Sequence, residues 1–164
     1  MKILDQHQIQ QKIKRLAIEI LENNFEEKSL VLLGINNNGT GFAGLLMDEL
    51  KKITTIQIHL FTVRLNPAAP LSAPIELNTP VESLKGKSII LIDDVANTGR
   101  TFFYACKPIL DILPKKLEVA VLVDRKHKMY PIYPKYVGLS LATTLKEDID
   151  LQIMDKKDWG VYMN

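Results

Sequence analysis

The sequence has few cysteines, little net charge and no long apolar run, and each of these absences excludes a class of protein. Its single cysteine, Cys106, excludes an internal disulfide and is consistent with the cytoplasm. With 21 lysines and arginines against 19 acids, the net charge of +2 is too small to indicate a nucleic-acid partner. No window approaches the roughly 18 apolar residues of a membrane span, and the opening MKILDQHQIQ lacks the apolar core of a signal peptide. His7, His59 and His127 share no metal-ligand spacing. We therefore expect a soluble globular protein without a disulfide framework or membrane anchor.

What the sequence does contain is an alternation of helical and strand patterns. Apolar residues recur every three or four positions in the first helix, which Asp5 can cap, and short β-branched runs indicate buried strands. The expected helices are 5–24, 42–52 and 101–113. The expected strands are 29–34, 53–64, 88–92 and 118–123. This order predicts one α/β domain over residues 1–164, with a doubly wound, mainly parallel sheet flanked by helices.

A proline-rich stretch interrupts this alternation between residues 66 and 87, and we expect a long loop there. Structureless loops of this length are uncommon in compact domains unless they are functional. The part from Asn66 to Ser83 has no lysine or arginine, which leaves Arg64 as the cation beside it.

The most informative segment is IILIDDVANTGRT, residues 89–101. An apolar strand ends in Asp93 and Asp94, at the edge where open α/β sheets bind ligands. The turn that follows offers backbone N–H groups and the hydroxyls of Thr98 and Thr101, which suit a phosphate. A ribose 5-phosphate presents both hydroxyls for the acids and a phosphate for the turn.

This segment resembles the signature of the type I phosphoribosyltransferases, two acids followed by a Thr-Gly-x-Thr loop. The resemblance extends over nearly the whole chain to the pyrimidine-operon attenuation proteins that double as uracil phosphoribosyltransferases. It is carried further by the first helix, the turn VLLGINNNG at 31–39, and the stretches 119–128 and 134–144. It implies the phosphoribosyltransferase fold, with a small hood over the base and a long mobile loop that closes over the reacting centre.

The resemblance also implies roles for individual residues. The catalytic residues would be Asp93, Asp94 and Arg64. The ribose and 5′-phosphate site would be Asp93, Asp94, Val95, Ala96, Asn97, Thr98, Gly99, Arg100 and Thr101. The pyrophosphate site would be Asn36, Asn37, Asn38 and Gly39. The base site would be Asp124, Arg125, Tyr136, Val137 and Gly138. For Asp124 with Arg125 a structural surface pair, and for Tyr136 a place in the core, are equally good interpretations. Mg²⁺ would bind through the substrate, with Asp93 and Asp94 as candidate ligands.

Several positions depart from the family pattern. Family members that use 6-oxopurines place an acid at position 97, whereas Asn97 cannot act as a general base near neutral pH, which favours a pyrimidine. The uracil-using subgroup has a tyrosine at this position. Asn37 and Asn38 stand where that subgroup has a threonine and an arginine. The cation-poor loop adds to these differences, because a donor with several phosphate charges normally meets more cations.

Three functions follow from the resemblance. The first is Mg²⁺-dependent transfer of ribose 5-phosphate from phosphoribosyl pyrophosphate to uracil or a related base, by a homodimer. The second is an RNA-binding attenuator, for which the small basic cluster of Lys12, Lys14 and Arg15 gives little support. The third is a non-catalytic sensor of phosphoribosyl pyrophosphate or a nucleotide, which the cation-poor loop favours.

Overall fold

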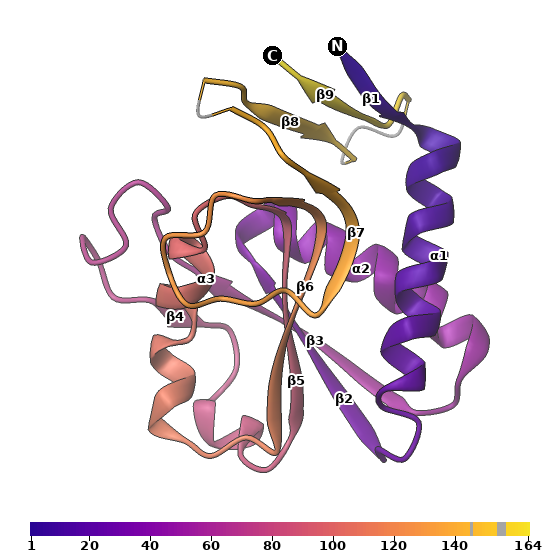
Figure 1. Cartoon of the computed structure of the whole chain (residues 1–164). Helices are drawn as coiled ribbons and strands as arrows, with labels where there is room; N and C mark the ends of the chain where they lie inside the picture. Colours follow the sequence, from indigo (N-terminus) through magenta and orange to yellow (C-terminus); the bar gives the residue numbers. More distant parts are fainter. Residues whose placement is uncertain (145, 154–156) are drawn as a thin grey trace.

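The computed structural model describes residues 1–144, 146–153 and 157–164, and its helices and strands alternate along most of the chain (Figure 1). The helices are α1 (Gln6–Glu22), α2 (Asn36–Ile53), α3 (Arg100–Ala105) and the 3-10 helices η1 (Val81–Leu84) and η2 (Lys107–Asp111). The strands are β1 (Lys2–Asp5), β2 (Ser29–Ile35), β3 (Gln57–Arg64), β4 (Glu76–Leu77), β5 (Ser88–Ala96), β6 (Lys116–Arg125), β7 (Tyr136–Leu141), β8 (Ile149–Gln152) and β9 (Gly160–Met163).

The main sheet has six strands in the order β4-β3-β2-β5-β6-β7. Its five long strands are parallel, and β4 pairs antiparallel to β3 at one edge. The chain builds outward from β2 to β3 and then returns to place β5 on the other side of β2. The carboxyl ends of β2 and β5 therefore flank the point at which the strand order reverses, where ligands bind in such sheets. The prediction of a doubly wound, mainly parallel α/β sheet is confirmed.

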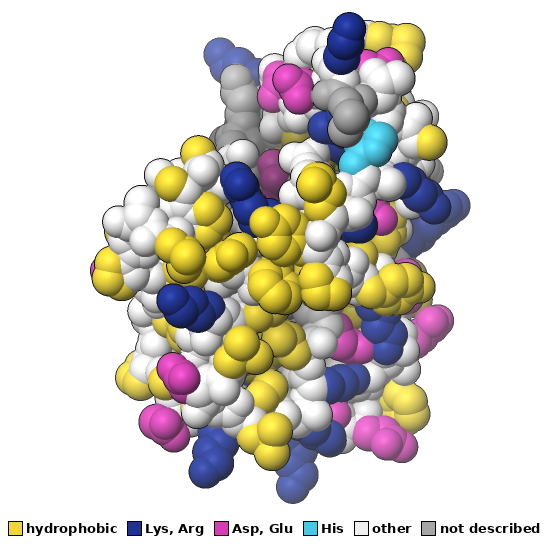
Figure 2. Space-filling model, turned by 60° about the vertical axis from the view of Figure 1, so that its left-hand side comes forward, with side chains coloured by type: hydrophobic (Ala, Val, Ile, Leu, Met, Phe, Trp, Pro, Cys, Tyr) yellow, Lys and Arg dark blue, Asp and Glu magenta, His cyan; other side chains and the backbone are white. Residues whose placement is uncertain are grey.

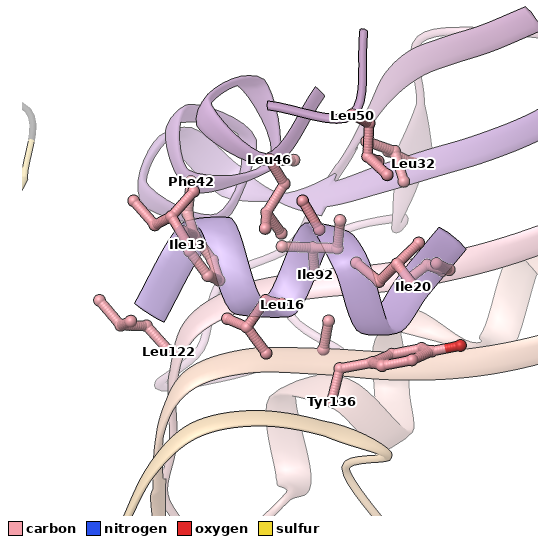
Figure 3. Packing of buried hydrophobic residues seen from close by; sticks show 14 of the residues in the cluster. Ile13, Leu16, Ile20, Leu32, Phe42, Leu46, Leu50, Ile92, Leu122 and Tyr136 are labelled. Atoms are coloured by element: carbon pink, nitrogen blue, oxygen red, sulfur yellow. The ribbon is translucent and has the colours of Figure 1, made fainter. Parts of the chain in front are cut away.

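Alternate residues of the central strands feed two separate hydrophobic cores. In β5, Ile90 and Ile92 face α1 and α2, whereas Ile89 and Leu91 face α3 and the 3-10 helices. Figure 3 shows the first core, in which side chains of α1 and α2 converge on Leu32, Ile92 and Leu122. Both faces of these strands are covered, so their sequences read as continuous apolar runs.

The start of α1 follows directly from its sequence. The Asp5 carboxylate accepts a hydrogen bond from the Gln8 amide at 2.8 Å, and the Gln8 side chain accepts one from the Asp5 amide at 3.0 Å. This reciprocal pair satisfies two N–H groups that have no partner within the helix. The predicted apolar stripe is confirmed, with Ile9, Ile13, Leu16, Ala17 and Ile20 buried.

A second, antiparallel sheet in the order β1-β9-β8 joins the two ends of the chain. It lies beyond the carboxyl ends of the main strands in Figure 1. The terminal ammonium of Met1 donates to the carbonyl of Met163 at 2.6 Å. This sheet was not predicted, and neither was β7.

Several predicted boundaries need correction. The strand expected over 53–64 begins only at Gln57, because Ile53 still belongs to α2, and the strand expected over 88–92 continues to Ala96. The stretch 66–87 is not structureless, because it contains β4 and η1. The helix expected over 101–113 stops at Ala105 and continues as η2, which has a proline in its first turn. The helix expected over 42–52 begins earlier, so that residues 36–39 form its first turn instead of a separate loop.

Candidate active site

The carboxyl ends of β2, β3 and β5 open onto a cleft of about 500 Å³. Its described lining comprises Ile35, Asn36, Asn37, Asn38, Arg64, Pro67, Asp93, Asp94, Val95, Asn97, Thr101, Ile149, Asp150 and Leu151. The predicted pyrophosphate turn, acidic pair and phosphate loop thus meet at one cavity. The strand β8 supplies the opposite wall.

Asp93 and Asp94 are half-buried in the last four residues of β5. The Asp93 carboxylate accepts the Asp94 amide at 2.9 Å, and the Asp94 carboxylate accepts the Val95 amide at 2.8 Å. Burial raises the pKa of Asp93 well above its ordinary value, and the charge of Asp94 raises it further. Burial also raises the pKa of Asp94, against hydrogen bonds from neighbouring groups that include Asn38. The pair therefore favours a ligand that brings positive charge or hydroxyl donors.

The turn at Asn36–Gly39 is held against both neighbouring strands. Asn36 has a positive φ of 53°, which asparagine tolerates. Its amide donates to the Leu65 carbonyl at 3.0 Å, and its side-chain oxygen accepts the Leu65 amide at 3.1 Å. A Cβ on Gly39 would lie 2.5 Å from the Ile92 carbonyl oxygen, so only glycine allows this approach to β5. Because α2 has no side-chain cap, its first-turn N–H groups suit an anion in the cleft.

Arg64 supplies a cation to this turn. Its guanidinium donates to the side-chain oxygen of Asn37 at 3.0 Å. Among the described residues that line the cleft, Arg64 is the only lysine or arginine. Asn37 therefore holds a cation from β3 beside a turn that has none of its own.

Residues 95–102 enclose a hollow of about 40 Å³ within their own loop. Gly99 adopts a left-handed φ of 86°, which reverses the chain before α3. The Thr98 hydroxyl accepts the Arg100 amide at 3.3 Å, and Arg100 donates to the Pro67 carbonyl at 2.7 Å. The loop is thus shaped by local bonds and is tied to the start of the proline-rich stretch. The role of this loop in binding a phosphate stays a prediction.

The residues assigned to the base lie outside the described lining of the cleft. The Asp124 carboxylate accepts a hydrogen bond from Lys128 at 2.5 Å, and the Arg125 side chain is buried against other parts of the protein. Both stand behind the phosphate loop, which agrees with the structural interpretation of this pair.

Tyr136 also lies away from the cleft, at the amino end of β7. Its ring is fully buried beneath α1 (Figure 3), and its hydroxyl donates to Glu118 at 2.9 Å. Val137 packs in the second core, and the Gly138 carbonyl accepts a hydrogen bond from Lys12 at 3.0 Å. The core interpretation of Tyr136 therefore replaces its assignment to the base, because a parallel strand presents its carboxyl end to the cleft and Tyr136 begins the strand.

Sequence reasoning missed the wall formed by Ile149, Asp150 and Leu151. Its signal is weak, since β8 is a four-residue strand with a short alternation of apolar and polar residues. Pairing with the distant β9 positions it, and this pairing cannot be read from a local pattern.

No group of three or more metal-ligating side chains occurs in the described parts of the chain. The fit to a divalent cation rests on Asp93 and Asp94, two adjacent carboxylates whose burial opposes their ionisation. Such oxygen ligands suit Mg²⁺ that keeps waters and phosphate oxygens as its other ligands.

Within residues 1–144, 146–153 and 157–164, no helix has the length and apolar character needed to cross a bilayer.

The fold and this cleft define a class of protein. The family model "Phosphoribosyl transferase domain" matches residues 1–152. The chain belongs to the phosphoribosyltransferase family, and its enzyme class is that of the pentosyltransferases.

Its relatives narrow the resemblance within the family. The "Bifunctional protein PyrR" of Pelotomaculum thermopropionicum is 34% identical over 161 residues, covering 94% of this chain and 89% of the relative. The "Pyrimidine operon regulatory protein" of Lactococcus lactis is 33% identical over 156 residues, covering 94% of this chain and 90% of the relative. These similarities confirm the predicted resemblance to the pyrimidine-operon attenuation proteins.

Solved structures agree on the fold. A hypoxanthine-guanine phosphoribosyltransferase of Bacillus anthracis superposes with a TM-score of 0.75 at 19% identity, covering 98% of this chain and 97% of that one. A hypoxanthine phosphoribosyl transferase of Trypanosoma cruzi gives 0.77 at 16% identity, with coverages of 98% and 90%. At these identities the likeness establishes the architecture alone.

Proposed function

We propose that this protein transfers ribose 5-phosphate from phosphoribosyl pyrophosphate to uracil, with release of pyrophosphate. The observation that carries the proposal is the convergence of three ligand-binding elements on one cleft. The first turn of α2, the pair of carboxylates and the loop residues Val95, Asn97 and Thr101 line the same cavity. These elements match the pyrophosphate, the ribose hydroxyls and the 5′-phosphate of the donor.

In the proposed reaction the anomeric carbon exchanges a pyrophosphate oxygen for a ring nitrogen of the base. Asp93 and Asp94 accept the ribose hydroxyls and lie near the positive charge that grows on the sugar. The first turn of α2 and Arg64 stabilise the negative charge that grows on the leaving group. Fixed donors and charges of this kind lower the barrier because they need no reorganisation during the reaction.

Mg²⁺ is part of the proposal, with Asp93 and Asp94 as the side chains that would hold it. When bound, it would neutralise pyrophosphate charge. Support comes from the raised pKa of both carboxyl groups, since their burial, with the charge of Asp94 beside Asp93, makes an added cation favourable.

The base is proposed to lie toward β8. Ile149 and Leu151 are half-buried and line the cleft there, so they offer an apolar contact for a planar ring. The amide at position 97 favours a pyrimidine, since a purine acceptor is served by an acid at that place in the family. The similarity to proteins named for the pyrimidine operon supports the same choice.

The first experiment measures pyrophosphate release from phosphoribosyl pyrophosphate and Mg²⁺ with uracil, cytosine, orotate, hypoxanthine, guanine, adenine and xanthine. We expect release with uracil, and its loss in the double variant Asp93→Asn, Asp94→Asn. The double variant Glu22→Gln, Glu26→Gln is the matched control, since it removes two exposed charges at the far end of α1. Donor binding without release for any base would refute transfer and favour the sensor. Release with a purine alone would refute the choice of uracil.

A second proposed function is pyrimidine-operon regulation through RNA, favoured by the name of the Lactococcus lactis relative. The basic residues of α1 give it limited support, since Lys12 is already bonded to the Gly138 carbonyl. A filter-binding titration with leader RNA at 50 and 200 mM salt tests this function. Phosphate contacts would make the affinity fall steeply with salt, and no binding at the lower salt would refute the role.

A homodimer in the cytoplasm completes the proposal. Figure 2 shows hydrophobic side chains gathered on the face that carries α3. Exposed apolar residues of α3, of η2 and the turn after it, and of the segment 129–133 are Phe103, Leu110, Leu113, Met129 and Tyr133. We assign this face to a second copy of the chain. Light scattering should give a dimer that Met129→Asp dissociates and Phe25→Asp, an exposed site elsewhere, does not.

A further inference from the structure

The buried guanidinium of Arg125 has a role that base binding does not describe. Arg125 ends β6 and is only 6% exposed. Its Nη1 donates to the side-chain oxygen of Asn97 at 2.9 Å, and its Nε donates to the Thr143 hydroxyl at 2.8 Å. Its Nη2 donates to the carbonyls of Thr144 and Glu147 at 3.1 and 2.5 Å. All four acceptors are uncharged groups, and the Glu147 carboxylate adds an electrostatic attraction to this buried cation.

These acceptors belong to two different walls of the cleft. Asn97 lies in the phosphate loop, which follows β5. Thr143, Thr144 and Glu147 precede β8 in the sequence, and residues 149–151 of β8 line the opposite side. One side chain therefore connects segments that are far apart in the sequence and that face each other across the cavity.

Further bonds hold the phosphate loop to the same support. Lys128 donates to the Asn97 carbonyl at 3.1 Å and to the Arg125 carbonyl at 2.5 Å. The Thr98 carbonyl accepts the amides of Met129 and Tyr130 at 2.9 and 3.2 Å. The loop after β6 thus fixes the back of the phosphate loop, and Arg125 extends this connection to the β8 wall.

We infer that Arg125 is a positioning residue that couples the phosphate loop to β8, so that order in one wall depends on order in the other. The physical reason is that a buried guanidinium is strongly unfavourable when it loses an acceptor. If either wall moves, the guanidinium loses partners and its bonds to the other wall weaken. The consequence for binding rests on the proposed function, in which the loop holds the 5′-phosphate and β8 faces the base.

This role also accounts for the amide at position 97. The side-chain oxygen of Asn97 accepts a hydrogen bond from Arg125, so Asn97 acts by holding Arg125 in place. Asn97 is exposed on its other sides, and its replacement removes no core packing. Asn97→Leu therefore breaks the connection without unfolding the chain.

The test is hydrogen exchange of the ligand-free protein, which requires no substrate. We expect Asn97→Leu to raise exchange in residues 146–152 by roughly tenfold, the effect of losing one hydrogen bond to a charged group. Arg125→Lys keeps the positive charge but loses the forked guanidinium that bonds to both walls, so it should raise hydrogen exchange in both of them. Lys126→Gln is the matched control, since it removes an exposed charge one position away and should change neither wall.

A double-mutant cycle separates coupling from general weakening. In the Arg125→Lys background, Asn97→Leu should add nothing to exchange in β8, because the connection is already broken. Additive effects, or unchanged exchange in β8 for Asn97→Leu, would overturn the inference. Titration with ribose 5-phosphate should show a weaker affinity of roughly tenfold for both single variants. If the wild-type protein does not bind ribose 5-phosphate, the proposed function fails while the exchange result still decides the coupling.

Discussion

Two glycines of α2 allow a sharp test of how the pyrophosphate turn is placed. A Cβ at Gly39 would lie 2.5 Å from the Ile92 carbonyl oxygen and 3.1 Å from an Asp93 carboxylate oxygen. Ordinary contacts begin at 3.4 Å, so Gly39→Ala must push the helix start back by about 0.9 Å. A Cβ at Gly44 would meet nothing closer than Leu60 at 4.0 Å. The same substitution in the same helix therefore has opposite expected effects.

The expected magnitudes follow from packing and from helix propensity. Gly44→Ala should stabilise the protein by about 0.5–1 kcal/mol, because alanine loses less conformational freedom than glycine in a helix. Gly39→Ala makes the same gain but adds an overpacking penalty of about 1–3 kcal/mol, for a net loss of up to about 2.5 kcal/mol. At this chain length each kcal/mol corresponds to a shift of roughly 2–4 °C in Tm.

The assays are thermal unfolding and calorimetric titration with pyrophosphate. We expect a lower Tm and weaker pyrophosphate binding for Gly39→Ala, and a higher Tm with unchanged binding for Gly44→Ala. A Tm change of the same sign in both variants would show that the contact with β5 does not fix the turn. Unchanged pyrophosphate affinity in Gly39→Ala would show that the turn is not the anion site.

Three further predictions concern the acids, the phosphate loop and the cysteine. Because the pKa of Asp93 is raised well above 3.8 by burial and by Asp94, the free energy of unfolding should fall as pH rises from 3.8 through the raised value. Asp93→Asn should remove the contribution of Asp93 to that decline and stabilise the ligand-free protein at pH 7 by about 1.4 kcal/mol for each unit of the rise, and an unchanged pH slope in urea denaturation would contradict this. Thr98→Ala should weaken calorimetric binding of a nucleotide 5′-phosphate roughly tenfold and spare free uracil, whereas equal losses would remove the loop's role. Burial raises the pKa of Cys106 to about 11, so iodoacetamide should label the native protein much more slowly than the urea-unfolded one at pH 8, and equal rates would contradict this.

The parts of the molecule that could be predicted depend on local patterns. The run 89–92 is apolar at every position because both faces of β5 are covered, and the two acids mark its carboxyl end. The capping pair of α1 and its apolar stripe are likewise written in neighbouring residues. These signals were sufficient for the central strands of the main sheet, for the acidic pair and for the turns on either side of the cleft.

The parts that could not be predicted depend on distant pairing. The β1-β9-β8 sheet joins residues at opposite ends of the chain, and its strands of four residues carry little periodicity of their own. The direction of the Arg125 side chain is a similar case. A charged pair at the end of a strand can either bind a ligand or hold other parts of the protein in place. Only the positions of Asn97, Thr143, Thr144 and Glu147 decide between these two roles.

The charge of the cleft leads to a last prediction, which concerns the metal. Its described lining contains the three acids Asp93, Asp94 and Asp150 against the single cation Arg64. A donor with several phosphate charges therefore enters a cleft whose own lining is acidic. Two unit charges about 4 Å apart interact by about 4 kcal/mol near a protein surface, which exceeds a tenfold change in affinity.

Removal of divalent cations should accordingly weaken phosphoribosyl pyrophosphate binding by at least roughly tenfold. The loss should be smaller for Asp93→Asn, because one of the repelling charges is gone. Calorimetric titrations with Mg²⁺ and with EDTA measure both quantities. Equal donor affinity in the two conditions would mean that Arg64 and the helix N–H groups suffice for the pyrophosphate, and that the acidic pair serves the ribose hydroxyls without a metal.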